Sequence, residues 1–179
     1  MKSNTKSGVV KRSVFLNPIT GVALIFFWGA MSNSTLASPI KDAIAEAEWR
    51  FGGEAFEAEL YRDEGRTLVE VELLVGKRIV EAEYDVRRGR ITDSEAYRSK
   101  RRVARVAGAL ERSRLTLYEV VQIADEAAGP GDVLEAELRL SRQAKRNGRR
   151  YEIELRNEEG LFDVIVNSRS GRVIRIRPD

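Results

Sequence analysis

The sequence lacks both cysteine and histidine, although it runs to 179 residues. The absence of cysteine excludes disulfides and thiolate ligands for zinc or iron–sulfur clusters. The absence of histidine excludes imidazole-based catalytic triads and histidine pH switches. Hydrophobic residues make up 42% of the chain and charged residues 33%, which is enough apolar material for a folded core. The composition therefore predicts one ordinary domain or two small ones, with few of the usual catalytic groups.

The formal net charge of +3 comes from one end of the chain. Residues 1–37 carry four basic side chains and no acidic one, whereas the chain from Ser38 onward has 27 basic against 28 acidic residues. A basic surface that could attract nucleic acid is therefore not predicted for the main part of the chain.

The N-terminal segment has the three-part pattern of a secretory signal peptide. Four cationic residues precede an apolar core over residues 22–31, and a region of small and polar residues ends at Ala37. An apolar helix of this length reaches about 15 Å, only half of the roughly 30 Å of bilayer hydrocarbon. We therefore expect cleavage after Ala37 and a periplasmic or secreted protein. The alternative is an uncleaved leader that acts as a membrane anchor.

An internal repeat is the most informative feature of the remaining chain. Three segments of the first half recur in the second half, at an offset of 78 residues and then of 82. The matched segments are 53–60 with 131–138, 69–73 with 151–155, and 84–91 with 166–173. The change of offset indicates a four-residue insertion within residues 142–147, where a surface turn tolerates extra length. The pattern predicts one unit present twice, over residues 40–92 and 117–175.

Each unit is predicted to be one helix packed on an antiparallel sheet. Apolar residues recur at helical spacing over residues 40–51 and 117–128, and each stretch ends at glycine. Three alternating segments and a short fourth follow, separated by glycine-containing turns. The predicted fold class is α+β, with two tandem copies of one helix on a three- to four-stranded antiparallel sheet. The aromatic residues Trp49, Phe51, Tyr151 and Phe162 are predicted to lie in the core.

The order of these motifs resembles the PepSY domain. The helix ends in a glycine pair in the first unit, and the strands read FEAEL and YEIEL. The closing strand is followed by Asp85 and Gly89 in the first unit and by Asn167 and Gly171 in the second. The resemblance implies a non-catalytic inhibitory or regulatory role, because PepSY domains occur in propeptides of secreted metallopeptidases and in cell-envelope proteins.

The first unit places six glutamates at outward positions of its three predicted strands. They are Glu57, Glu59, Glu70, Glu72, Glu81 and Glu83. Carboxylates on paired strands lie about 5 Å apart and repel one another, so something is expected to offset that repulsion. Three interpretations stay open: a cationic partner surface docks here, the face is simply solvated, or another part of the same chain balances it.

The connector between the units is the candidate for internal balance. Residues 96–115 hold seven basic residues and one acidic residue, whereas residues 41–95 hold 9 basic and 15 acidic ones. Apolar residues at helical spacing predict an amphipathic helix over the connector, with its arginines on the other side. The candidate basic residues are Arg98, Arg101, Arg102 and Arg105.

The outward glutamates do not read as an enzyme site. A catalytic carboxyl needs an apolar pocket that raises its pKa, and alternating glutamates on an exposed strand lack one. The sequence contains no phosphate loop, no serine nucleophile elbow and no zinc-peptidase motif. Carboxylates can bind calcium, but no EF-hand spacing is present. We therefore expect no catalytic residue, no metal site and no cofactor.

The sequence as a whole predicts an exported, non-enzymatic PepSY-type binding module. Its parts are a signal peptide (1–37), a first PepSY-like repeat (38–94), a basic connector helix (95–115) and a second repeat (116–179). The expected partner is a protein, in particular a secreted or envelope peptidase that the module regulates or inhibits through its sheet faces. Nucleic acid is not expected, and a membrane only with an uncleaved leader. In that case the alternative is a structural or sensory component of the envelope.

Overall fold

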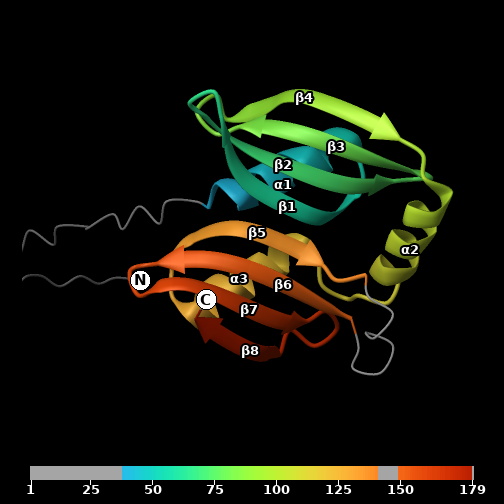
Figure 1. Ribbon diagram of the computed structural model, residues 1–179. Helices are drawn as coiled ribbons and strands as arrows, with labels where there is room; N and C mark the ends of the chain where they lie inside the picture. The colour runs from blue at the N-terminus through green and yellow to red at the C-terminus, as the bar shows by residue number, and fades with distance from the viewer. Residues whose placement is uncertain (1–37, 141–148, 179) are drawn as a thin grey trace, which may run out of the picture. The chain divides into compact units, whose positions relative to one another are not determined.

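The computed structural model describes residues 38–140 and 149–178, which form three helices and eight strands (Figure 1). The helices are α1 (Pro39–Phe51), α2 (Lys100–Leu110) and α3 (Leu117–Ala128). The strands are β1 (Glu54–Asp63), β2 (Arg66–Val75), β3 (Arg78–Asp85), β4 (Arg90–Tyr97), β5 (Asp132–Leu138), β6 (Arg150–Asn157), β7 (Gly160–Asn167) and β8 (Val173–Pro178). The predicted signal peptide and the insertion within residues 142–147 lie outside the described residues.

All eight strands belong to one open antiparallel sheet, with the order β4-β3-β2-β1-β5-β6-β7-β8. The sequence predicts a separate sheet for each unit, and this expectation is corrected by the pairing of β1 with β5. That pairing joins the two halves through three residue pairs centred on Ala58 and Ala136. The physical reason is that β1 and β5 would each be an exposed edge strand in an isolated unit, with unpaired backbone groups. Their pairing removes two edges and leaves only β4 and β8 at the ends of the sheet.

Helices α1 and α3 cover one face of this sheet, behind the strands in Figure 1. Each helix buries a stripe of residues spaced three and four apart. In α1 these are Ile40, Ala43, Ile44 and Ala47. The prediction that Trp49 is a core residue was wrong, because its position falls off that stripe and its side chain is 81% exposed. Among the other predicted core aromatics, Tyr151 is fully buried, whereas Phe51 and Phe162 are half-buried.

The helix ends follow the signals in the sequence. Pro39 occupies the first turn of α1, and Gly52 ends that helix in the left-handed conformation, with φ 64°. Thr116 and Glu119 form a complete capping box at the start of α3. These local signals fix where each helix begins relative to the sheet below it.

The two halves share their strand irregularities as well as their order of elements. The β1 ladder shifts register between Ala55 and Glu57, and the β5 ladder shifts between Val133 and Glu135, 78 residues later. These bulges place Phe56 and Leu134 at equivalent positions. The β3–β4 and β7–β8 ladders likewise shift after residues 83 and 165. A bulge bends its strand and redirects a side chain, so both halves bend at the same place.

The Asp-x-x-x-Gly motif of the first half and the Asn-x-x-x-Gly motif of the second half form turns of the same kind. The Asp85 side chain accepts a hydrogen bond from the Arg88 backbone N–H at 2.9 Å, and the Asn167 side chain accepts one from the equivalent backbone N–H of Ser170 at 3.1 Å. Gly89 and Gly171 end these turns with φ 61° and 68°, in the region that favours glycine. The motif therefore has a structural role at the end of β3 and of β7.

Helix α2 is shorter than the predicted connector helix. The sequence prediction began the connector at residue 95, but β4 continues to Tyr97 and the Ser99 side chain caps α2. Helix α2 packs against β1 and β2, and buries Val106, Ala109 and Leu110. None of the helices in residues 38–140 and 149–178 is long and apolar enough to cross a membrane.

Candidate functional site: an acidic sheet face

The sheet face opposite α1 and α3 carries carboxylates across its whole width. Strand pairing aligns them in two rows, because directly opposite residues of an antiparallel pair share a face. One row runs through Glu95, Glu81, Glu72, Glu57, Glu137 and Glu152. The other runs through Asp93, Glu83, Glu70, Glu59, Glu135, Glu154 and Asp163. We call these 6 and 7 side chains together the acidic face.

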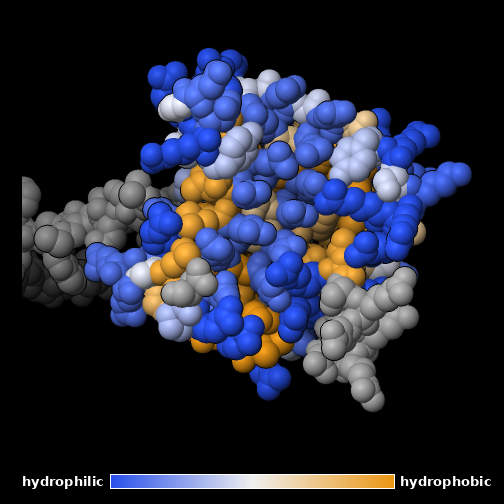
Figure 2. Space-filling view, viewed as in Figure 1, coloured by the Kyte–Doolittle hydropathy of each residue, from blue (hydrophilic) through white to orange (hydrophobic). Residues whose placement is uncertain are grey.

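The six glutamates predicted as a binding face all lie in these rows. The sequence reasoning missed the other seven carboxylates, from β4, β5, β6 and β7. The repeat was a usable signal for four of them, since EAEL in residues 135–138 and YEIEL in residues 151–155 alternate as the first unit does. The joining of the two halves into one sheet is what makes the rows continuous. The face of the sheet turned to the viewer in Figure 2 is correspondingly largely hydrophilic.

Arg102 of α2 lies against this face at its most buried point. Its guanidinium is 2.5 Å from the Glu72 carboxylate and 3.4 Å from that of Glu57, and it donates to the Tyr97 hydroxyl at 2.7 Å. Its carbon Cζ also lies 5.7 Å from the centre of the Phe56 ring. One arginine thus combines two ion pairs with a cation–π contact. Arg102 therefore brings a positive charge of the connector to part of the acidic face, which is one of the three arrangements that the sequence left open.

Burial makes Glu72 the most perturbed carboxyl of the acidic face. Only 6% of the residue is exposed. Burial, and then repulsion from Glu57, raises the pKa of Glu72 to about 7, against the opposing attraction of Arg102. Burial is also the first cause of the raised pKa values of Glu57 and Glu70. Near neutral pH the buried centre of the face therefore carries less negative charge than its count of carboxyl groups.

The other basic candidates of the connector lie away from the carboxylates. Arg98, Arg101 and Arg105 are exposed, and Arg105 donates to the Leu140 carbonyl at 3.3 Å. Within the described residues Arg102 alone of the four forms an ion pair. Helix α2 therefore points one arginine at the acidic face and exposes the others to solvent.

Arginines carried by the sheet itself balance other parts of the acidic face. Arg139 pairs with Glu137 and Glu152, and the guanidinium of Arg177 lies 2.6 Å from the Asp163 carboxylate. The sequence reasoning did not assign these arginines to the acidic face, because Glu152 and Asp163 lie on neighbouring strands.

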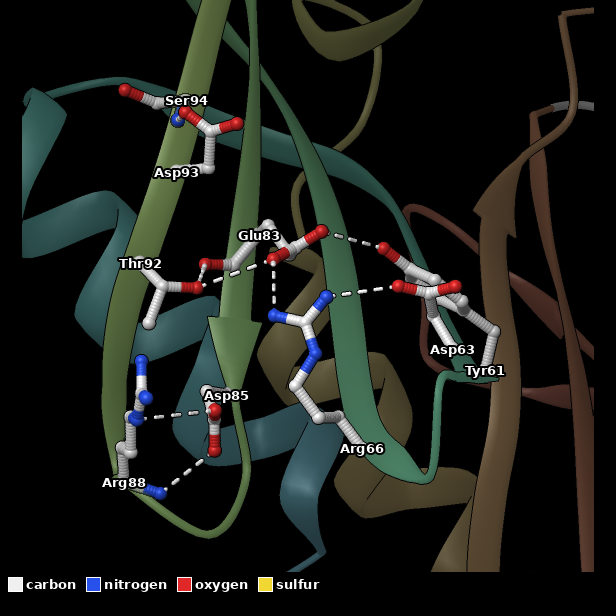
Figure 3. A network of polar contacts seen from close by, with 9 residues as sticks. All are labelled: Tyr61, Asp63, Arg66, Glu83, Asp85, Arg88, Thr92, Asp93 and Ser94. Atoms are coloured by element: carbon white, nitrogen blue, oxygen red, sulfur yellow. Dashed lines mark hydrogen bonds and ion pairs between the residues drawn. The ribbon is translucent and has the colours of Figure 1, made fainter.

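Figure 3 shows a further network at the β1–β2 hairpin. Arg66 lies 2.8 Å from Asp63 and 3.9 Å from Glu83, whose carboxylate also accepts a hydrogen bond from the Tyr61 hydroxyl at 2.9 Å. Burial and the neighbouring Glu83 raise the pKa of Tyr61 to about 12, so this hydroxyl stays a donor. Glu83 thus accepts hydrogen bonds from Tyr61 on β1 and Thr92 on β4, and forms an ion pair with Arg66 on β2.

Three carboxylates of the acidic face approach one another closely. Single oxygens of Glu70, Glu72 and Glu81 lie within 4.8 Å of one another, a spacing that a hard cation such as calcium accepts. Arg102 already brings a positive charge to Glu72. Within this cluster, Glu72 therefore already has a cationic partner.

A groove of about 620 Å³ opens where β1 and β5 diverge. The ladder between these strands ends at the pair Glu59–Glu135, and the bulge at Leu134 bends β5 beyond it. The groove is lined by Pro39, Glu59, Leu60, Tyr61, Arg62, Thr67, Asp132, Leu134, Glu135, Glu154 and Arg156. Four carboxylates and two guanidinium groups give this lining a net charge of −2. Sequence reasoning missed the groove, because it exists only where the halves meet.

Comparison with known proteins bears on the second half of the chain. Residues 114–177 match the PepSY family, described as "Peptidase propeptide and YPEB domain". This match contains α3 and strands β5 to β8, so the resemblance seen in the sequence is confirmed for that half. It does not extend to the first half, for which PepSY membership stays a prediction.

The similarity to individual proteins is weaker. No curated protein matches the chain significantly. Among solved structures, the chain is similar to a "putative lipoprotein" from Clostridium difficile 630, at 19% identity and a TM-score of 0.47. That alignment covers 78% of this chain and 92% of the other.

Proposed function

We propose that this protein is an exported, non-catalytic module of two PepSY-like units that binds a protein partner through its acidic face. The partner we propose is a secreted or envelope peptidase, which the module regulates or inhibits. The observation that carries the proposal is the two continuous rows of carboxylates, on the face that α1 and α3 leave uncovered. The PepSY match over residues 114–177 supports the class of partner.

The proposal of two units rests on the internal comparison of the halves. Both halves have the order helix, then four antiparallel strands, and both have bulges at equivalent positions. Gly53 and Gly131 also occupy equivalent places before β1 and β5. A Cβ atom at Gly53 would lie 2.6 Å from a Val75 methyl group, and one at Gly131 would lie 2.4 Å from the Arg156 carbonyl oxygen. The same close approach of chain segments supports a common origin for the two units.

The acidic face suits a cationic protein surface because its charge is only partly balanced. Arg66, Arg102, Arg139, Arg150 and Arg177 reach carboxylates of the rows, whereas the rows contain 6 and 7 carboxylates. Repulsion between neighbouring carboxylates falls when a positive surface approaches, so docking relieves an unfavourable interaction of the free protein. Charge of one sign over a broad face also speeds association with an oppositely charged partner.

To test the proposal, the purified protein is added to envelope and culture fractions of the producing cells. The peptidase activity of these fractions is then measured. We expect peptidase activity to change in a saturable manner, and less at high salt, because salt screens exposed charges. The key variant is Glu59→Lys combined with Glu70→Lys, which reverses charge at the centre of one row. A matched control is Glu64→Lys combined with Glu158→Lys, two exposed turn residues outside the rows.

The outcomes separate clearly. The row variant should lose the effect on peptidase activity while keeping a cooperative thermal transition, and the turn variant should keep the effect. If the wild-type protein leaves peptidase activity unchanged at every concentration, the peptidase is not its partner. If the row variant acts as the wild type does, the acidic face is not the docking surface.

A further inference from the structure

The two halves contain equivalent sites beside the β1–β5 junction, and one of them is filled. In the first half Phe56, Glu57 and Glu72 receive Arg102 of α2. Phe56 is 1% exposed and Glu72 is 6% exposed. This site, which we call the covered site, shows how an arginine of an amphipathic helix fits the acidic face.

The equivalent residues of the second half form the groove between β1 and β5. The offsets of 78 and 82 residues relate Phe56 to Leu134, Glu57 to Glu135 and Glu72 to Glu154. Pairing agrees with this assignment, since Glu57 lies opposite Glu72 and Glu135 lies opposite Glu154. Both members of the second pair line the groove together with Leu134.

Burial distinguishes the two sites. Leu134 and Glu154 are half-buried, unlike their buried counterparts Phe56 and Glu72. The groove thus repeats the acidic pair and the bulge residue of the covered site, and within the described residues it has no counterpart of α2.

We propose that the groove binds an arginine-bearing amphipathic helix of the protein partner, in the way that α2 fills the covered site. The arginine enters between Glu135 and Glu154, and apolar side chains of the helix pack on Leu134. This inference deepens the proposed function and rests on it, because the helix belongs to the partner that docks on the acidic face.

Charge and size both fit this occupant. The lining has a net charge of −2, so it attracts a cationic side chain. Arg62 and Arg156 also line the groove and repel further positive charge, so the lining suits a ligand with few basic groups. A space of about 620 Å³ accommodates several side chains of one helix face and not a whole globular surface. Leu134 has no aromatic ring, so the groove lacks the cation–π contact of Phe56 and should bind more weakly than a tethered helix.

The chain supplies its own probe for the experiment. A peptide of residues 99–113 contains α2 with its cap and carries five basic residues and one acidic residue. Binding of the fluorescently labelled peptide to the full-length protein is measured by anisotropy. We expect Glu135→Gln combined with Glu154→Gln to weaken binding about tenfold, the loss expected from removing two half-buried charge-assisted contacts. A peptide with Arg102→Gln should lose affinity to the same extent.

The matched control is Glu57→Gln combined with Glu72→Gln, which alters the covered site. It should change peptide affinity by less than about twofold, since α2 already occupies that site. If instead this variant alone weakens binding, the peptide replaces α2 and the inference is wrong. The inference is also wrong if neither variant weakens peptide binding, or if the peptide does not bind the wild-type protein.

A second measurement locates the peptide directly. Because the chain has no cysteine, Thr67→Cys creates a single site on the groove for a thiol-attached photocrosslinker. We expect crosslinking to the peptide, and none from Arg87→Cys at the exposed turn after β3. Equal crosslinking at both positions would contradict the inference. Peptide binding at the groove with no effect on any peptidase would instead leave the inference standing and disprove the peptidase partner.

Discussion

The two halves of the sheet are alike on the helix-covered face and differ on the open one. Val71 and Ile153 are equivalent and buried, as are Leu73 and Leu155. On the open face, however, the edge strand β4 presents Asp93 and Glu95, where β8 presents Arg175 and Arg177. The order of strands and the bulges persist despite this reversal of charge. The fold is therefore determined by the inward positions, and the outward positions can carry binding specificity.

The covered site and the groove show the clearest difference between the two halves. The same acidic pair occurs in both, but α2 changes burial around only one of them. Stability should consequently depend on the covered site, and binding on the groove. Three comparisons, each between two variants, test that division.

The largest effect is expected from the two bulge residues. Phe56→Ala should lower the free energy of unfolding by about 3–5 kcal/mol, because it removes a fully buried ring and leaves a cavity. Leu134→Ala should cost about 1–2 kcal/mol, because the leucine is only half-buried. Urea denaturation monitored by circular dichroism measures both values.

Equal losses for these two variants would show that the sites do not differ in the way their burial indicates. Val164→Ala is a suitable control for the method. Val164 is buried on the helix-covered face of β7 and belongs to neither site, and its truncation should reduce stability in either case.

Much of this fold follows from local sequence signals. The two helical stretches, their glycine stops and the alternation of the strands were all readable, because each depends on neighbouring residues. The union of two sheets was not readable, since the β1–β5 ladder is only three pairs long and joins distant segments. Trp49 was misplaced because one aromatic residue is a weaker signal than the spacing of the alanines and isoleucines around it.

An effect of intermediate size is expected from pH. The folded pKa of Glu72, about 7, lies above its ordinary value of 4.5, so between these pH values the folded state binds more protons than the unfolded state. Stability therefore falls as pH rises from about 5 to about 8, by an amount on the order of 1–3 kcal/mol from this group. Glu72→Gln should remove that part of the slope and stabilise the protein at pH 8. Thermal melts at a series of pH values measure it.

Glu154→Gln is the matched control for this measurement. It removes the equivalent carboxylate of the second half, where the side chain is half-buried and lines the groove. We expect little change in the pH slope from this variant. A slope that both variants reduce equally would mean that α2 does not set the environment of Glu72.

The candidate site was only partly readable from the sequence for a related reason. The period of two placed the glutamates of the first unit on one face, since alternation is a local property. Such local patterns could not show which of the four candidate arginines of the connector would contact a carboxylate. Which of them reaches a carboxylate depends on where α2 begins, and the start at Lys100 places Arg102 towards Glu72.

The smallest effect is expected from the arginines of α2, and it tests whether this helix acts through one residue. Arg102→Gln should lower stability by about 1 kcal/mol at low salt, because the ion pairs are lost but the side chain is about one-third exposed. The loss should shrink at high salt, since screening weakens the same pairs in the wild type. Arg101→Gln, at an exposed neighbouring position, should change stability by less than about 0.5 kcal/mol at either salt concentration. Equal effects of the two variants in thermal melts would mean that the helix acts through its net charge, and then a partner helix would need basic character in general rather than one arginine at a defined place.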